Sequence, residues 1–458
     1  MSLNYQPGYM MRVLTFVSLS VLVGAPALGT PPDYVTFGRT QQVHYSPNEA
    51  DLLRIVLVFV EQGDGILIQF PERFAYDPDD GADGWERIEV MIDGGSMPTN
   101  HAGLMGCAVD NILGDDRIIE HVVITHHDQD HIAGLTRMMR DGDYTFSHVY
   151  HNGLASWRAG KRGFPASGSS EQKAVRKTPR WMAYVNNDGT LTKKHIIDDL
   201  DELRTRLADE ELHGIYKSLA VQIIGNADIG QLASFDRVFI GSPFVGEVEL
   251  DEGMDLENLS FEMVWPQDSL RPYGGTSWSE TVNGNSVTFM LRYGDFEMLF
   301  TGDQNQHSEE ALLKHLGEDS GKLRCDVLKV PHHGSGGDHA CEEFYEAVAP
   351  VVGVCSMGNK GFKADGWQHP NPEVIRWVGG PHRFYSTFIH ERRFRYEQIT
   401  TTAKRNIMIE RSHVVIETDG KWFRIIEVPA DDGGFGAIPA VQDTRRGDGT
   451  RWIKADDS

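Results

Sequence analysis

The first half of the chain contains short apolar runs that predict β-strands. Residues 53–60 and 66–70 are apolar and are joined by a glycine-bracketed turn, which predicts a hairpin. Two further runs, 88–95 and 118–125, also have the character of strands, and each ends in polar residues. Helical spacing of apolar residues begins directly after the second of these runs, at 131–142. The local order is therefore strand, polar loop, helix.

The second half alternates strands with helices and contains further hairpins. Helical spacing is present at 198–220 and 308–316, whereas strand-like runs occupy 260–266, 285–303, 325–335 and 412–428, the last with a turn at Asp419-Gly420. This mixture predicts an α/β fold with mixed sheets layered against helices. Residues 155–196 are rich in Gly, Ser and Lys, which predicts an exposed insertion. One hypothesis is that this insertion covers the functional site as a lid. Residues 429–458 are predicted to form a flexible tail.

The N-terminal segment, residues 1–30, has the layout of a secretory signal peptide. Arg12 precedes an apolar run at 13–24, and Ala25-Pro26-Ala27 follows as a small-residue cleavage site. The run is too short to cross a bilayer. We therefore expect an exported protein, periplasmic or secreted, with no membrane span after the signal is removed. The alternative is an N-terminal extension that forms a buried helix in a cytoplasmic protein.

Charge argues against one class of partner. The chain has 43 basic and 67 acidic residues and a formal charge of −24, so its surface repels phosphate backbones. Strong nucleic-acid binding is not expected, and the basic stretch 173–180 is interpreted as a solvated loop. The four cysteines form no C-x-x-C pair, which argues against a disulfide scaffold or a zinc ribbon.

Three segments place potential metal ligands directly after apolar strands. Neutral imidazole and carboxylate groups are the ligands that zinc and related divalent metals prefer. Together the three segments hold enough ligands for two metals, with one carboxylate available to bridge them. The residues are His126, His127, Asp128, Asp130 and His131 in the first segment, Asp303 in the second, and His332 and His333, followed by Gly334 and Ser335, in the third.

The order of these motifs resembles a known family. The sequences GDGILI, MIDGG, THHDQDHIAG, GNSVTFMLRYGDFEMLFTGD, LKVPHHGS and QHPNPEVI are similar to the metallo-β-lactamase fold, specifically to its competence-protein (ComEC-type) branch. The resemblance covers residues 52–428 apart from the insertion. The usual signature of the family is His-x-His-x-Asp-His, whereas this branch has His-x-Asp-x-Asp-His, as found at residues 126–131.

The resemblance implies an αβ/βα sandwich of two mixed sheets flanked by helices, with two zinc ions at one edge. It implies that His126 and Asp128 bind one metal, that Asp130, His131 and His333 bind the other, and that Asp303 bridges them. His369 is a further implied ligand, and Asp93 is implied to orient a ligand histidine. Asp130, Asp303 and His332 are the implied catalytic residues, with His332 facing the substrate and the amides of Gly334 and Ser335 binding phosphate.

The chain departs from the family at one expected ligand. Many members supply another histidine between the first cluster and the bridging aspartate, where this sequence has Asn283, Asn285 and Ser286. This difference predicts that the metal bound by His126 and Asp128 is the more labile of the two. His148 or His151 would compensate, or both would serve as strand-end packing residues. His127 lies at the variable position of the motif and is predicted to be exposed and non-ligating.

These features predict a zinc-dependent hydrolase that acts on phosphodiesters or related phosphoesters through a metal-activated hydroxide. The substrate would be a small-molecule or polymeric phosphoester. One alternative is hydrolysis of carboxylic esters, lactones or β-lactams, because a fold does not determine its reaction. A second is a non-catalytic binding or sensor module with structural metals. The natural substrate and the oligomeric state are left open.

Overall fold

The computed structural model describes most of the chain from residue 47 onward. The described residues are 47–74, 87–96, 104–114, 116–156, 185–245, 258–274, 277–337, 339–358, 369–380, 383–388, 411–430 and 453–455. The predicted signal segment 1–30 and the basic stretch 173–180 therefore lie outside the described residues. Among the residues that are described, no helix combines the length and apolar character needed to cross a bilayer.

The first sheet contains nine strands among the described residues and is mixed. Its strands are β1 (Leu53–Leu57), β2 (Ile66–Gln69), β3 (Glu89–Ile92), β4 (Ile118–Ile124), β5 (Thr145–His151), β6 (Ser234–Arg237), β13 (Ser412–Thr418), β14 (Trp422–Pro429) and β15 (Ile453–Lys454). They lie in the order β15-β14-β13-β1-β2-β3-β4-β5-β6. Pairing is antiparallel from β15 to β3, which includes the predicted β1–β2 hairpin, and parallel from β3 to β6.

The second sheet is also mixed and contains six strands in the described part of the chain. These are β7 (Leu259–Trp265), β8 (Thr288–Tyr293), β9 (Phe296–Phe300), β10 (Val327–Lys329), β11 (Val352–Cys355) and β12 (Phe384–Ser386), and they lie in the order β12-β11-β10-β9-β8-β7. Pairing is antiparallel from β7 to β9 and parallel from β9 to β12.

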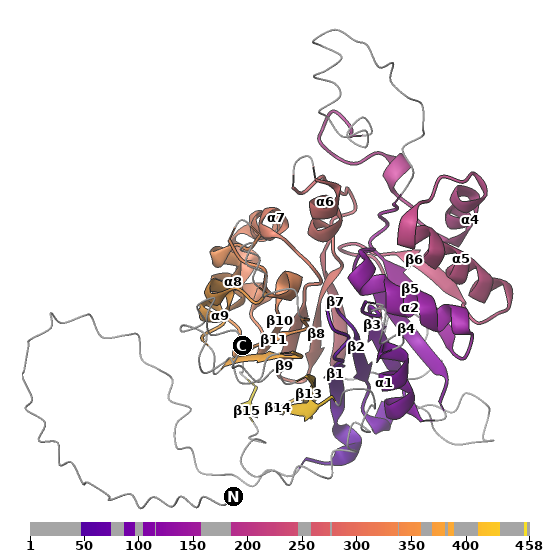
Figure 1. Ribbon diagram of the computed structural model, residues 1–458. Helices are drawn as coiled ribbons and strands as arrows, with labels where there is room; N and C mark the ends of the chain where they lie inside the picture. Colours follow the sequence, from indigo (N-terminus) through magenta and orange to yellow (C-terminus); the bar gives the residue numbers. More distant parts are fainter. Residues whose placement is uncertain are drawn as a thin grey trace, which may run out of the picture. The chain divides into compact units, whose positions relative to one another are not determined.

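Helices cover the outer face of each sheet (Figure 1). On the first sheet these are α1 (Leu104–Leu113), α2 (Gln129–Asp141), α4 (Leu200–Ala208) and α5 (Gly214–Asp228), and on the second they are α7 (Gln306–Leu316), α8 (Glu342–Val348) and α9 (Pro372–Trp377). Helix α6 (Trp278–Gly284) precedes β8, and short 3-10 helices occur at Glu49–Asp51, Glu72–Phe74, Lys193–His195, Gly317–Leu323 and Pro331–Gly334. The result is the predicted sandwich of two mixed sheets between helices.

The pattern of burial in β1 explains why its sequence is continuously apolar. Leu53, Ile55 and Leu57 lie in the core between the two sheets. Val56 and Val58 point the other way and pack in the core between the sheet and its helices. Because side chains alternate across a strand, a sheet that is covered on both faces needs apolar residues at every position. The observed strand ends at Leu57, and residues 58–60 continue as buried non-strand backbone.

Two segments differ from their predicted character. The predicted insertion ends in residues 185–196, where 186–188 are exposed as predicted but Leu191 and Ile196 pack with Leu154 and Leu270 in a small apolar cluster. In the predicted tail, Ile453–Lys454 pair with β14 as an edge strand. Both segments are held by apolar or backbone contacts that local composition does not reveal.

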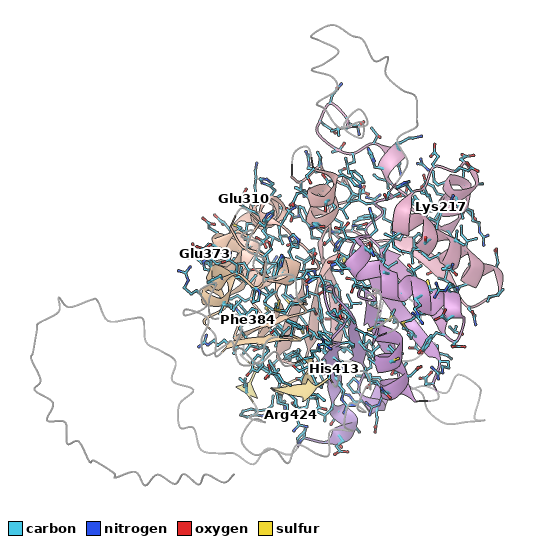
Figure 2. All side chains as sticks on the ribbon, in the orientation of Figure 1. Lys217, Glu310, Glu373, Phe384, His413 and Arg424 are labelled. Atoms are coloured by element: carbon cyan, nitrogen blue, oxygen red, sulfur yellow. The ribbon has the colours of Figure 1, made fainter. Side chains whose placement is uncertain are left out.

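Two histidines on strands of the first sheet are buried, and burial favours their neutral form. His413, which is labelled in Figure 2, lies on β13 and accepts a hydrogen bond from the Phe59 amide at 3.1 Å. Burial lowers its pKa to about 4. His121 on β4 lies beside Tyr150 and His148, and burial lowers its pKa to about 3.

We expect these histidines to make the fold sensitive to acid. A histidine in the unfolded chain binds a proton near pH 6.5, whereas the buried one does so only near pH 4. As the pH drops below about 6.5, the unfolded state therefore binds protons that the folded state does not, and the free energy of unfolding falls. For His413 the loss between pH 7 and pH 5 is about 2 kcal/mol. Urea unfolding of wild type and His413→Gln at both pH values measures this. Equal losses in the two proteins would contradict the assignment.

Candidate metal centre

The candidate metal centre forms where the carboxyl ends of four strands meet. Asp93 follows β3, His126 follows β4, Asp303 follows β9, and His332 and His333 follow β10. Both strand pairs, β3–β4 and β9–β10, are parallel, so each pair delivers its polar residues to the same edge of its sheet. Helix α2 begins immediately after the first cluster and carries Asp130 and His131 in its first turn.

Asp303 is at the middle of this group. Its Oδ2 atom is 3.2 Å from Nε2 of His131 and 3.3 Å from Nε2 of His333. The same oxygen is 3.9 Å from the Nε2 atoms of His126 and His332. Asp303, His126, His131 and His333 are all buried. Three buried imidazoles and a partly exposed fourth therefore converge on one carboxylate.

The donor atoms in this group fit a bound metal. Among the described residues, the buried Nε2 atoms of His126, His131 and His333 and Oδ1 of Asp303 have no hydrogen-bond partner. Buried polar atoms are rarely left unsatisfied, and imidazole nitrogen with carboxylate oxygen is a typical zinc ligand set. Two overlapping groups have their donor atoms within 4.8 Å of one another: His126, His131 and Asp303 in one, and Asp130, His131 and His333 in the other.

Hydrogen bonds behind the imidazoles set the orientation of the rings. Nδ1 of His131 donates to Oδ2 of Asp93 at 2.8 Å, and Asp93 also accepts from the amide and the hydroxyl of Thr125. Nδ1 of His333 donates to the Ser356 carbonyl at 2.9 Å. With the Nδ1 proton held in these bonds, each ring in its neutral form presents an Nε2 lone pair to Asp303. Asp93 thus orients the ring of His131, as the resemblance implied for a ligand histidine.

The electrostatics of the centre favour an ionised Asp303 carboxylate and a neutral His126 imidazole. Burial by itself would raise the pKa of Asp303, but the neighbouring His333, His131 and His332 lower it well below its usual range. Burial, reinforced by the neighbouring His131, lowers the pKa of His126 well below its usual value. At neutral pH, Asp303 therefore carries a negative charge and His126 offers a lone pair, as a metal site requires.

Asp128 is held by helix α6 in this structure. The Ser279 hydroxyl donates to its Oδ2 atom at 3.4 Å, and the Asn283 amide can turn to donate to the same oxygen at 3.2 Å. Burial and the nearby Asp130 raise the pKa of Asp128 to about 6. Asp128 belongs to none of the donor groups found within the described residues. Its role as a ligand therefore stays a prediction.

His332 is the most exposed of the four imidazoles that face Asp303, with 13% of its side chain accessible. The backbone φ angles of His332 and His333 are 46° and 53°, so both residues are in the left-handed region. This conformation is uncommon for residues other than glycine, and where it occurs it is often at a functional site. The ring of His369 is 5.9 Å from that of His332 and 6.3 Å from that of His333, measured between ring centroids. His369 is buried beside the centre but joins none of the donor groups found in the described residues, so its role as a ligand also stays a prediction.

Ser286 belongs to the segment in which many members of the resembled family supply another histidine, and it lies beside the centre. Its hydroxyl oxygen is 3.4 Å from Nδ1 of His126 and accepts a hydrogen bond from the Asp303 amide at 3.1 Å. His148 and His151 do not replace the missing ligand in the described donor groups. His148 contacts the Ser234 hydroxyl at 3.0 Å, and His151 stacks on Phe235 at 3.9 Å between ring centroids, as packing residues do.

Two sequence-based expectations near the centre are wrong. His127 is not exposed: it is 6% accessible, it packs against the ring of Tyr216, and burial lowers its pKa to about 4. Helix α5 and α6 cover this position, which its local sequence does not indicate. The amide of Ser335 is not free to bind phosphate, because it donates to the His332 carbonyl at 2.9 Å.

Sequence reasoning missed Asp64 and Lys329. Each side chain is 1% exposed, and Nζ of Lys329 is 2.5 Å from Oδ2 of Asp64. Asp64 also appears in two donor groups with residues of the centre. A usable signal was present, because Lys329 interrupts an apolar strand and lysine is almost never fully buried unless it is paired.

Comparison with known proteins agrees with the resemblance to competence proteins. No family model matches the chain. ComE operon protein 3 of Bacillus subtilis (strain 168) is 24% identical over 132 residues, or 29% of this chain, and competence protein ComA of Neisseria gonorrhoeae is 29% identical over 150 residues, or 32%. The matched segments span only 15% and 20% of the lengths of these two relatives.

Solved structures superpose only loosely. A long-form RNase Z from yeast matches with a TM-score of 0.35 at 10% identity, covering 75% of this chain and 41% of its own. MEM-A1, a subclass B3 metallo-β-lactamase from a soil metagenome library, matches with a TM-score of 0.26 at 12% identity, covering 60% and 79%. The two curated relatives confirm the resemblance to competence proteins, and the two-sheet architecture is the one that the metallo-β-lactamase fold implies: this chain is similar to the competence-protein branch of that fold.

Proposed function

We propose that this protein is a metal-dependent hydrolase, with zinc as the metal and phosphodiesters or related phosphoesters as its substrates. The observation that carries the proposal is the convergence of three buried Nε2 atoms on the Asp303 carboxylate, with no other hydrogen-bond partner among the described residues. A divalent cation satisfies such a set, and zinc prefers imidazole and carboxylate ligands of this kind. His126, His131, Asp130, Asp303 and His333 are the residues that would hold it.

The residues around the centre suit ester hydrolysis. Zinc held by such ligands supplies Lewis acidity and lowers the pKa of water toward neutrality. Asp93 and the Ser356 carbonyl hold the ligand rings in one tautomer and exclude other orientations. His332 is the one imidazole of the group with an exposed part, so it is placed to donate a hydrogen bond or a proton to an oxygen of the substrate. Asn283, 3.3 Å from His332, restrains that ring.

Two alternatives are less well supported. Hydrolysis of carboxylic esters, lactones or β-lactams would use the same residues, but the His-x-Asp-x-Asp-His motif at residues 126–131, which resembles the competence-protein branch, favours it less. A structural metal in a binding module would normally have its four ligands closed around it. The partly exposed His332 and the excess of donor atoms oppose that interpretation.

The location and the partner are also proposals. The layout of residues 1–30 supports export to the periplasm or the medium. A charge of −24 opposes tight binding to nucleic acid, so a small phosphoester or an envelope polymer suits the surface better.

The test combines elemental analysis with hydrolysis of bis-p-nitrophenyl phosphate, for wild type and His333→Ala. We expect about two zinc ions per chain in wild type, as in dinuclear hydrolases of this kind, and a loss of turnover of at least about a hundredfold in the variant. His315→Ala, which changes an exposed histidine on α7, is the matched control and should retain both. Turnover of lactones or β-lactams in place of the phosphodiester would favour the first alternative. Bound zinc without any turnover would favour the second.

A further inference from the structure

We infer that the buried Lys329 ammonium is a permanent positive charge behind the metal ligands. Together with Asp64 it balances the charge of the metal centre and positions the imidazole ligands. The inference rests on the proposed metal site but does not depend on which substrate is hydrolysed. Neither residue belongs to the ligands that the sequence motifs identify. Their place in the structure, buried behind the ligands, is what assigns them this role.

The Lys329 ammonium joins two loops that build the centre. Lys329 is the last residue of β10, and its Nζ atom contacts Oδ2 of Asp64 at 2.5 Å and donates to the Gly302 carbonyl at 3.3 Å. Gly302 immediately precedes Asp303, and Asp64 belongs to the loop between β1 and β2. Burial opposes the charged form of lysine, but Asp64 and Asp303 outweigh it and raise the pKa of Lys329, so the ammonium is charged at neutral pH.

Asp64 faces the back of two ligand rings. Its Oδ1 atom is 3.6 Å from Nδ1 of His333, and its Oδ2 atom is 4.0 Å from Nδ1 of His131. Both rings point their opposite nitrogen, Nε2, toward Asp303. A carboxylate on the Nδ1 side favours the tautomer that keeps Nε2 free for a metal. Asp64 therefore supports the orientation that Asp93 and the Ser356 carbonyl impose.

The ammonium stands where a further cation would otherwise be favoured. Donor atoms of Asp64, Asp303 and His333 lie within 4.8 Å of one another, as do those of Asp64, Asp93 and His131. With Lys329 paired to it, Asp64 contributes no net charge to this group. Burying two ions costs several kcal/mol each, so a pair of hydrophobic residues would be an equally stable way to fill the space. A neutral balance of charge behind the ligands, and not stability, is then what the pair supplies to the centre.

This role predicts opposite effects for the two single variants. Asp64→Asn leaves an unpaired ammonium near the ligands, which repels divalent cations, so zinc affinity should fall about 10-fold to 100-fold. Lys329→Met leaves an unpaired carboxylate, so zinc affinity should rise about 10-fold or a further cation should bind. The neutral double variant Asp64→Asn/Lys329→Met should bind zinc within about threefold of wild type. A purely structural pair predicts that both single variants lose affinity.

The experiment measures zinc affinity by competition with a chromogenic chelator and zinc content by elemental analysis, on the full chain. The exposed pair Asp319 and Lys322, joined at 2.9 Å, supplies matched controls, because Asp319→Asn and Lys322→Met should change neither value. Shifts of opposite sign in the two buried variants support the inference. Parallel losses, or no change, overturn it. If the single variants do not fold, a loss above about tenfold in the double variant also overturns it.

The outcomes separate this inference from the proposed function. Opposite shifts in zinc affinity in a protein that hydrolyses no phosphodiester would support the role of Lys329 and reject the hydrolase. Normal turnover in wild type with parallel losses of affinity in the two variants would do the reverse. A wild-type chain that binds no zinc would overturn both.

Discussion

Replacing Asp303 with alanine is expected to reduce phosphodiester hydrolysis by at least about a thousandfold, more than the loss of any single hydrogen-bond donor in a catalytic site. Asp303 is the carboxylate that four imidazoles face, with Oδ2 at 3.2 to 3.9 Å from their Nε2 atoms. Its removal takes away the carboxylate of one candidate donor group and the oxygen that faces His333 of the other at 3.3 Å, so zinc content should fall as well. Steady-state turnover of bis-p-nitrophenyl phosphate, with zinc content measured in the same preparations, checks this.

The matched control is Asp319→Ala, which removes an exposed aspartate from the 3-10 segment Gly317–Leu323. It should retain wild-type turnover and zinc. An Asp303→Ala protein that keeps two zinc ions and most of its activity would show that Asp303 is not shared between the metals. Circular dichroism of both variants separates loss of the centre from loss of the fold.

Gly134→Ala should lower the free energy of unfolding by about 3 kcal/mol or more, at the upper end for overpacking substitutions. A Cβ atom at Gly134 on α2 would lie 1.8 Å from the Gly94 carbonyl oxygen, which is backbone and cannot move aside like a side chain. The Gly134 amide donates to the Gly95 carbonyl at 3.0 Å, and the Gly94 amide donates to the His131 carbonyl at 2.6 Å. The methyl group would push α2 away from β3, together with the candidate ligands Asp130 and His131.

Gly225→Ala on α5 is the control for this prediction. A Cβ atom there meets nothing within 4 Å among the described atoms, so alanine should stabilise the helix by about 0.5–1 kcal/mol. Denaturant unfolding of both variants measures the contrast. Gly134→Ala should also weaken zinc binding, which Gly225→Ala should not. Equal stabilities would mean that α2 can shift without cost, and would contradict the close approach seen here.

The local sequence was informative wherever neighbouring residues share one element. The hairpin of β1 and β2, the strand before His126 and the helix that starts near Asp130 follow from apolar spacing and turn residues, because these depend on contacts within a few positions. The ligand set was also recognisable, since His126, Asp130 and His131 are close in the chain. Asp303 and His333 were identified by the same rule, each directly after an apolar strand.

Other features depended on elements far apart in the chain. The burial of His127 comes from α5 and α6, which begin 87 and more positions away, and Asp128 is engaged by Ser279 of α6. Residues 185–196 looked polar and exposed, but Leu191 and Ile196 pack against Leu270. No local pattern records which surface a residue will meet when a later helix folds over it.

The sequence by itself indicated many of the strands and helices, including the β1–β2 hairpin, and the set of imidazole and carboxylate groups that follow strands, whereas the sandwich of two mixed sheets came from the family resemblance. Only the tertiary structure decided how these groups are arranged: four imidazoles face Asp303, Asp128 is turned toward α6, and Ser286 lies beside His126. It also paired Lys329 with Asp64 beneath the ligands. The physical reason is that element formation depends on local spacing, whereas charge balance and burial depend on which distant loops meet at the sheet edge.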